Sequence, residues 1–175
     1  MKRYSGVKSG FGLVELLVAV SLFSIVTMIA VGGFIGSLRN QRRAAALVAA
    51  QSSLSLVVEQ MAREMRLGHY FCDTAHTTCS GLNEVMFVDS NSNTITYRFN
   101  NNAIERSEDG NLTFEKLTSD SVVVEYLVFR LQGNLASDTF PPRITISIGA
   151  RGKDVPRGAE IVRMQTTVSA RFLDT

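Results

Sequence analysis

A stretch of 23 residues without a charged side chain, from Leu16 to Leu38, constrains this chain more than any other feature of its sequence. A helix rises about 1.5 Å per residue and needs about 20 apolar residues to cross a bilayer, so the stretch is long enough to span one. A secretory signal peptide has a shorter apolar stretch followed by a cleavage site, whereas helix-favouring sequence continues here. The stretch therefore predicts a membrane anchor.

The charges of the chain are unevenly distributed around this stretch. Lys2, Arg3 and Lys8 place three positive charges on the first ten residues, which contain no acid, whereas the whole chain has a net charge of only +2. The remaining residues include 15 basic and 16 acidic side chains, so they offer no basic surplus for binding nucleic acid. Three arginines between residues 39 and 43 follow the apolar stretch, so charge alone leaves its orientation open.

The predicted helix can continue beyond the apolar stretch, because residues 40–67 contain neither proline nor glycine to interrupt it. Apolar residues recur there at spacings of three and four, the stripe of an amphipathic helix: Leu47, Ala50, Leu54, Val57 or Val58, Met61 and Met65. Gly68 is expected to end the helix, because glycine is common directly after the last helical residue. The sequence therefore predicts one helix from Phe11 to Leu67, apolar on all sides at first and amphipathic later.

The weakest point of the predicted helix is Gly32-Gly33, with Gly36 one turn further on. Glycine inside a helix costs about 1 kcal/mol relative to alanine, so a local unwinding is one expectation for this point. Close packing of helices through small residues within a membrane is an equally weighted alternative.

After Gly68 the sequence changes to short alternating runs separated by turns rich in asparagine, serine, threonine and glycine, which is typical of β-strands. The predicted strands are Val85–Val88, Thr94–Phe99, Ala103–Arg106, Val122–Leu131, Arg143–Ile148 and a last one with apolar positions alternating from Val162 to Phe172. The run at 122–131 is apolar on both faces except at Glu125 and Arg130, so we expect it to be a central strand. The predicted fold class is α+β, a long N-terminal helix packed on a C-terminal antiparallel β-sheet domain.

Two cysteines, Cys72 and Cys79, precede the first predicted strand. Their spacing favours a small disulfide loop in an oxidising compartment, and free thiols are a second interpretation. A zinc site that includes His76 is a third, but a fourth ligand and the usual short spacing of zinc motifs are missing. We expect no metal ion and no cofactor.

Glu15 is the acid that stands inside the hydrophobic helix. A carboxylate in lipid costs several kcal/mol unless it is paired or protonated, so such residues are functional by default. The alternative is that Glu15 lies close enough to the end of the helix for its carboxylate to reach the lipid headgroups.

The sequence around Glu15 resembles the class III signal of type IV prepilins and pseudopilins. In that family the leader ends in glycine, phenylalanine usually follows, and glutamate is the fifth residue of the mature chain; Gly10, Phe11 and Glu15 occupy these positions. The resemblance implies that an aspartyl prepilin peptidase cleaves after Gly10 on the cytoplasmic side and methylates the new amino group of Phe11. Because this cut precedes the helix, the helix stays attached and the domain beyond it lies outside the cytoplasm.

The resemblance also implies a role in assembly. The amino group of Phe11 is expected to pair with Glu15 of an adjacent subunit and so to fix the register between them. The implied partners are the prepilin peptidase, other pilins or minor pseudopilins, and an assembly platform in the bacterial inner membrane. The expected organisation is a leader (1–10), a transmembrane helix (11–38), its amphipathic continuation (39–68) and an extracytoplasmic β-rich domain (69–175).

Two further features resemble minor subunits of this family more than the abundant ones. Major pilins commonly have threonine after the first phenylalanine and proline about two-thirds of the way through the apolar segment, where this chain has Gly12 and Gly32. The sequence from Thr94 to Arg106 resembles a hairpin of J-type minor pseudopilins and related minor pilins. The expected function is that of a minor pilin or pseudopilin in filament assembly or initiation, in a type IV pilus, a type II secretion pseudopilus or a DNA-uptake pilus.

The sequence shows no motif of an enzyme, and we expect none. Glu105, Glu108 and Asp109 with Gly110 do not have the spacing of an EF-hand, so an exposed turn is expected there instead of a calcium site. The alternative function is a signal-anchored extracytoplasmic binding or sensory domain that does not polymerise. That alternative leaves the spacing of the glycine, phenylalanine and glutamate unexplained.

Overall fold

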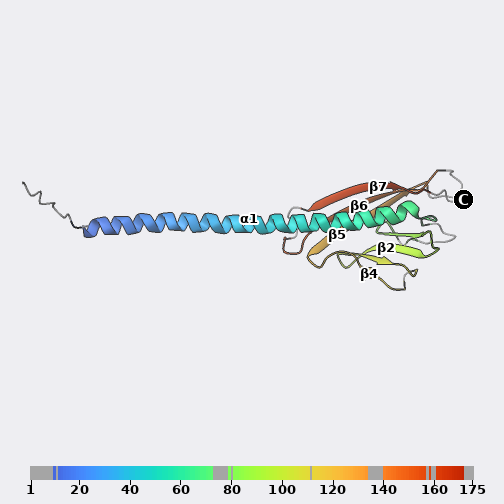
Figure 1. Ribbon diagram of the computed structural model, residues 1–175, viewed down its shortest axis with the longest axis horizontal. Coiled ribbons are helices and arrows are strands. Elements are labelled where there is room, and N and C mark those ends of the chain that lie inside the picture. Colours follow the sequence, from blue (N-terminus) through green and yellow to red (C-terminus); the bar gives the residue numbers. More distant parts are fainter. Residues whose placement is uncertain are drawn as a thin grey trace, which may run out of the picture. The chain divides into compact units, whose positions relative to one another are not determined.

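The computed structural model describes residues 10, 12–72, 79, 81–110, 112–133, 140–156, 158 and 161–171. Within these residues, one helix precedes seven strands: α1 (Leu13–Leu67), β1 (Glu84–Val88), β2 (Thr94–Asn100), β3 (Ala103–Ser107), β4 (Glu115–Lys116), β5 (Val122–Gln132), β6 (Arg143–Gly152) and β7 (Val162–Ser169). This order confirms the α+β class, with a long N-terminal helix ahead of antiparallel strands (Figure 1). Phe172, the last residue of the predicted final strand, lies outside the described residues.

Helix α1 runs without interruption through its glycines. The expectation of a local unwinding at Gly32-Gly33 is therefore wrong. A Cβ atom placed on either glycine, or on Gly36, would meet nothing within 4 Å. These positions are open in the single chain, so close packing against other helices stays the interpretation of their small size.

Helix α1 ends at Leu67, directly before Gly68, as predicted, and the packing around position 68 leaves no room for a side chain. A Cβ atom at this position would collide with the ring of Phe87, which packs against the backbone here. The chain then turns to pair with β1, because His69 and Val88 exchange two backbone hydrogen bonds of 3.0 and 2.9 Å.

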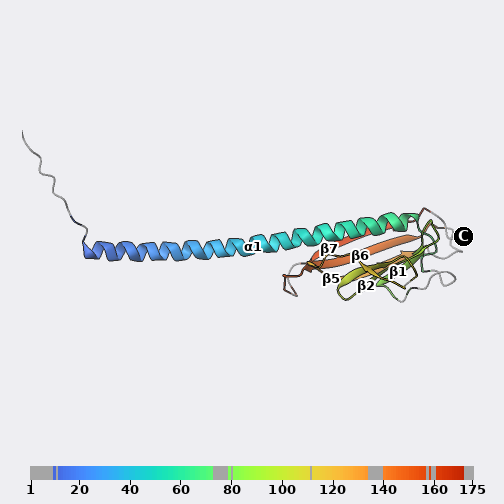
Figure 2. The ribbon, with the colours of Figure 1, turned by 60° about the horizontal axis from the view of Figure 1, so that its bottom comes forward.

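The chain divides into two compact units, Met1–Arg42 and Arg43–Thr175. The second unit contains the C-terminal part of α1 and all the described strands. Its strands form two antiparallel sheets instead of the single sheet expected. Sheet 1 has the order β1-β2-β3-β4, and sheet 2 has the order β5-β6-β7. Figures 1 and 2 show both sheets alongside the C-terminal part of α1.

The prediction that residues 122–131 form a central strand is wrong. Strand β5 is an edge of sheet 2, whose central strand is β6. The free edge of β5 instead meets loops of sheet 1: Val124 donates its N–H to the carbonyl of Asn102 at 2.9 Å, and Phe129 donates to that of Leu82 at 2.7 Å. The mostly apolar sequence of β5 fits its place where the two sheets meet, with Glu125 and Arg130 as its charged exceptions.

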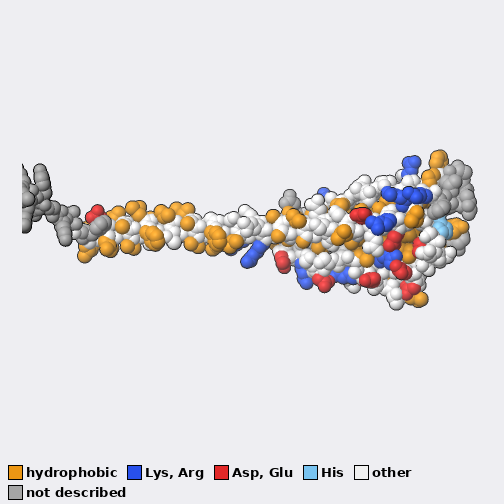
Figure 3. Space-filling view, viewed as in Figure 1, with side chains coloured by type: hydrophobic (Ala, Val, Ile, Leu, Met, Phe, Trp, Pro, Cys, Tyr) orange, Lys and Arg blue, Asp and Glu red, His pale blue; other side chains and the backbone are white. Residues whose placement is uncertain are grey.

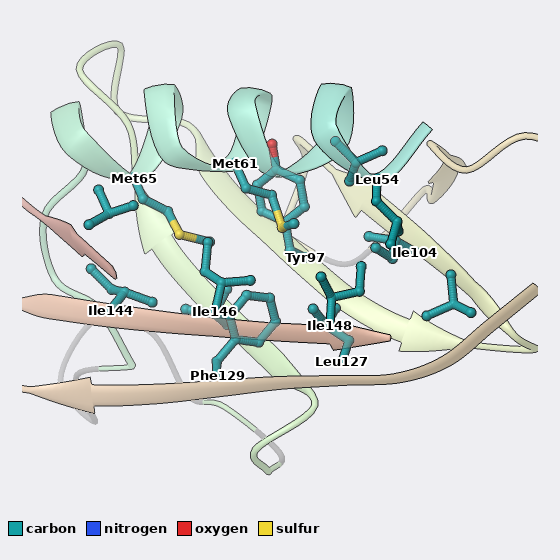
Figure 4. Close-up of a cluster of buried hydrophobic side chains, with 14 of the residues drawn as sticks. Leu54, Met61, Met65, Tyr97, Ile104, Leu127, Phe129, Ile144, Ile146 and Ile148 are labelled. Carbon is teal, nitrogen blue, oxygen red and sulfur yellow. The ribbon is translucent and has the colours of Figure 1, made fainter. Parts of the chain in front are cut away.

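The core of the second unit lies between α1 and the two sheets (Figure 4). On the helix the buried residues are Ala50, Leu54, Val57, Met61 and Met65, which confirms the predicted stripe. Facing them from the sheets are Tyr97, Ile104, Leu127, Phe129, Ile144, Ile146 and Ile148. Burying one large apolar side chain contributes roughly 1.5–3 kcal/mol, so this contact fixes the helix on the sheets.

Candidate assembly site

The predicted processing signal lies directly before the first turn of α1. Gly10 and Gly12 are exposed, and Leu16 donates its N–H to the carbonyl of Gly12 at 3.2 Å. Regular helical hydrogen bonding therefore begins two residues after the expected cleavage position. Phe11 and residues 1–9 lie outside the described residues, so the Gly10–Phe11 bond and the methylation of Phe11 stay predictions.

Glu15 lies in the first turn of α1 and is exposed. A carboxylate at this end of a helix is favoured by the helix dipole, typically by 0.3–1 kcal/mol. Among the residues that the structure describes, no cation forms an ion pair with Glu15. The position is thus compatible with a partner from another chain, and the pairing with Phe11 remains a prediction.

The first unit exposes a continuous apolar surface. Leu13, Phe23 and Met28 are 78%, 71% and 77% exposed. Figure 3 shows hydrophobic side chains crowded along this part of the helix. Helix α1 is long and apolar enough to cross a membrane, and none of its most apolar window is buried in the structure. Soluble proteins rarely expose so large an apolar surface, so it is suited to lipid or to other apolar helices.

The polar side chains within this surface bond to their own helix. Ser21, Ser24 and Thr27 each donate their hydroxyl hydrogen to the carbonyl four residues earlier, at 2.8 Å. In lipid no water is present to satisfy a hydroxyl, so these internal bonds remove the main obstacle to placing them there.

A polar cluster that the sequence did not predict links α1 to sheet 1. Glu64 accepts a hydrogen bond from the hydroxyl of Tyr97 at 2.8 Å and one from Nε of Arg106 at 3.0 Å. Arg106 also pairs with Glu108 and lies 5.9 Å from the centre of the Tyr97 ring. Tyr97 points its hydroxyl toward the helix in Figure 4. The sequence gives no signal for this cluster, because its members lie 33 and 42 residues from Glu64.

The protonation states in this cluster follow from burial and charge. Burial, together with the charge of Glu64, raises the pKa of the Tyr97 hydroxyl well above its usual range. Burial alone would lower the pKa of Arg106, but hydrogen bonds to Glu108 and Glu64 outweigh it and raise the pKa. Tyr97 therefore stays a neutral donor and Arg106 stays charged, so the cluster holds α1 at a fixed register on sheet 1.

Cys72 and Cys79 form a disulfide in the structure, with Cα atoms 5.2 Å apart. Cys72 donates its N–H to the carbonyl of Met86 at 2.9 Å, and the N–H of Met86 lies 3.2 Å from Sγ of Cys79. The disulfide therefore joins Cys72 to Cys79, and the two contacts with Met86 hold both cysteines against strand β1. His76, which the zinc interpretation required, lies outside the described residues.

Asp109, one of the acids considered for a calcium site, orders an exposed turn. Asp109 accepts hydrogen bonds from the N–H groups of Leu112 and Thr113, at 3.1 and 2.9 Å, and from the hydroxyl of Ser107. The hydroxyls of Ser107 and Thr113, followed by these N–H groups, hold the pKa of Asp109 well below its usual range. Within the described residues, no group of three or more histidine, cysteine, aspartate or glutamate side chains gathers in a metal-binding arrangement.

An exposed apolar helix of membrane-spanning length fits a single-pass membrane anchor, and the sheet domain packed on its continuation gives the chain a pilin-like architecture. Residues 7–31 match the model of the prokaryotic N-terminal methylation motif, which is the signal of type IV prepilins. The motif supports membership of the type IV pilin and pseudopilin family, whose members are structural subunits. It implies processing by a prepilin peptidase and assembly with other pilins. No curated protein and no solved structure is significantly similar to the chain.

Proposed function

We propose that this chain is a minor subunit of a type IV pilus or of a type II secretion pseudopilus, and that it acts in filament assembly or initiation. The match of residues 7–31 to the methylation motif carries the proposal. In this function the leader 1–10 is removed, residues 11–38 span the inner membrane, residues 39–68 continue the helix, and residues 69–175 form the extracytoplasmic domain.

Glu15 has the central role in the proposed assembly. Cleavage at Gly10 creates an amine on Phe11, four positions before Glu15, and each group alone is unfavourable in an apolar surrounding. Two unit charges 4 Å apart attract by about 4 kcal/mol at an effective dielectric constant of 20. Pairing between adjacent subunits therefore favours one register of the helices over others. The exposure of Glu15, with no described cation beside it, supports this role.

The assignment to the minor class rests on the sequence at three places. Gly12 and Gly32 stand where major pilins commonly have threonine and proline, and the β2–β3 hairpin carries the sequence that resembles minor pseudopilins. The disulfide between Cys72 and Cys79 supports an extracytoplasmic location, because disulfides persist in oxidising compartments.

Mass spectrometry of the N-terminus of the chain, purified from the membranes of its own host, tests the proposal. We expect a mature chain that begins with N-methylated Phe11. An intact Met1, or a cut at another bond, would instead favour an anchored binding or sensory domain that does not polymerise.

A further inference from the structure

In the part of the chain that the structure describes, the two sheets have four edge strands, and three of these edges are protected. An unprotected edge presents unpaired backbone N–H and carbonyl groups that can pair with another chain, so proteins usually cover or shorten their edges. The edge of β1 pairs with His69, and both cysteines of the disulfide contact the backbone of Met86. The edge of β5 is bonded to the loops at Leu82 and Asn102. Strand β4 is only two residues long, and both are charged.

The fourth edge, strand β7, has a different character. It lies outermost in sheet 2, where it pairs with β6 alone (Figure 1). Its eight residues, Val162–Ser169, include neither proline nor lysine, and Arg163 is the one charged side chain among them. Among the described residues, no backbone hydrogen bond joins this strand to the helix or to a loop. We therefore call the side of β7 that faces away from β6 the open edge.

The strand register identifies the backbone groups at the open edge. Ala170 donates its N–H to the carbonyl of Pro142 at 2.8 Å, and the same register continues along β6 and β7. In an antiparallel pair, residues that bond across the strands alternate with residues whose N–H and carbonyl groups point away. The residues of β7 that alternate with the bonded ones therefore direct these groups to the open edge: Arg163, Gln165, Thr167 and Ser169.

Beside the open edge lies an apolar strip that the chain covers only in part. Val162 and Met164 pack against the core from β7 but are only partly buried, and the same is true of Val58 and Ala62 on α1. The hydroxyl of Ser55 lies 4.0 Å from Sδ of Met164, so this side of the helix is next to β7. A strand added to β7 would cover the strip with the side chains that it points toward the core.

The two faces of β7 indicate the chemistry of the strand that would fit there. Toward the core, apolar side chains are needed beside Val162 and Met164. On the outer face Gln165 and Thr167 favour polar neighbours, and the exposed Arg163 favours an acid. Strand β7 itself contains no acid, so the β7 strand of a second copy does not meet this requirement.

We propose that the open edge of β7 binds an extended segment of a different polypeptide by β-strand addition. The segment alternates apolar with polar residues and places an acid beside Arg163. In this mode of recognition main-chain hydrogen bonds supply affinity, and the alternating side chains supply specificity. The inference goes beyond the proposed function, because it concerns the second unit alone and needs neither cleavage of the leader nor a filament.

A synthetic peptide with this pattern tests the proposal on the full-length chain in detergent micelles. The probe is a soluble, fluorophore-labelled peptide about as long as β7, in which valine alternates with threonine and a glutamate lies at each end. We expect saturable binding in fluorescence anisotropy. We also expect hydrogen exchange at the amides of Gln165 and Thr167 to slow about tenfold or more, whereas the amides of Met164 and Val168, already bonded to β6, should change little.

A proline at position 165 provides the matched comparison. Gln165→Pro removes an N–H that points to the open edge, so the bonds between β6 and β7 are kept. We expect it to weaken peptide binding about tenfold. Gln165→Ala is the control, because it keeps the N–H and should bind the peptide as the wild type does. Circular dichroism and thermal unfolding show whether both variants are folded.

A charge reversal decides the question if the proline variant does not fold. Arg163→Glu, an exposed substitution, is expected to weaken binding about two- to fivefold, and a peptide with lysine in place of glutamate should restore it. Binding that is insensitive to both variants would overturn the proposal.

Further outcomes would also overturn it. If the alternating peptide does not bind, or a peptide of the same composition in scrambled order binds equally well, strand addition is rejected. Slow exchange at Gln165 and Thr167 before any peptide is added would show that the edge is already covered. Protection that rises with the concentration of the chain alone would show that a second copy, and not a different polypeptide, is the partner.

Discussion

The two parts of helix α1 have the same backbone conformation and opposite surfaces. Between Leu13 and Leu38 the large apolar side chains point outward on all sides, and none of the most apolar window is buried. Between Ala50 and Met65 the buried side chains form one stripe, and charged residues such as Glu59 and Arg63 occupy the exposed side. The pattern of apolar side chains around the helix, and not helix propensity, therefore decides whether a part of α1 suits an apolar environment on all sides or packing against a sheet on one side.

The largest expected effect concerns the single acid of the first part. We expect Glu15→Gln to abolish incorporation of the chain into filaments, because the neutral amide cannot pair with the charged amine of the neighbouring Phe11. Immunoblotting of sheared filaments against membrane fractions measures incorporation. Glu59→Gln, an exposed acid on the second part of the same helix, is the control and should incorporate normally. Normal incorporation of the Glu15 variant would reject the register role.

A second prediction concerns the stripe of the second part. Met61 is fully buried, so Met61→Ala is expected to destabilise the second unit by about 2–5 kcal/mol through lost contacts and a cavity. Leu56 is 69% exposed on the same helix, and Leu56→Ala should change stability by about 0.5 kcal/mol or less. Chemical denaturation of the detergent-solubilised chain, followed by circular dichroism of the sheets, compares the two. Equal losses would contradict the assignment of the buried stripe.

The third and smallest effect concerns the polar link between helix and sheet. Arg106→Ala leaves the partly buried Glu64 without its cation, and we expect a loss of about 1–3 kcal/mol. Arg63→Ala removes an exposed pair with Glu59, which typically contributes about 0.3–0.5 kcal/mol. The same denaturation measurement applies. A loss from Arg106→Ala no greater than that from Arg63→Ala would show that the cluster does not hold the helix in place.

The helix and most strands were predictable because their signals are local. The spacing of Leu54, Met61 and Met65 is a helical period that needs no knowledge of the rest of the fold. The place of β5 was not predictable in the same way, because an apolar strand can be covered by a neighbouring strand or by loops. Here the loops at Leu82 and Asn102 cover it.

In the candidate site too, residues close together along the chain could be predicted, and contacts made only by tertiary packing could not. Gly10, Phe11 and Glu15 could be selected from the sequence because they are close along the chain and their spacing resembles a processing signal. The Glu64–Tyr97–Arg106 cluster could not, because only tertiary packing brings residues from the helix and two strands together. The ion pair between Arg98 on β2 and Glu105 on β3 also depends on strand register, which a sequence pattern leaves undetermined.

The internal bonds of Ser21, Ser24 and Thr27 have a consequence for movement between surroundings. Each hydroxyl is already bonded within its own helix, so it has no donor that must find a new acceptor when the surroundings change. A helix of this kind exchanges lipid tails for apolar side chains by trading one set of van der Waals contacts for another. Transfer from a bilayer into a bundle of helices therefore leaves these three hydrogen bonds intact. The number of satisfied hydroxyl donors in this segment is the same before and after the transfer.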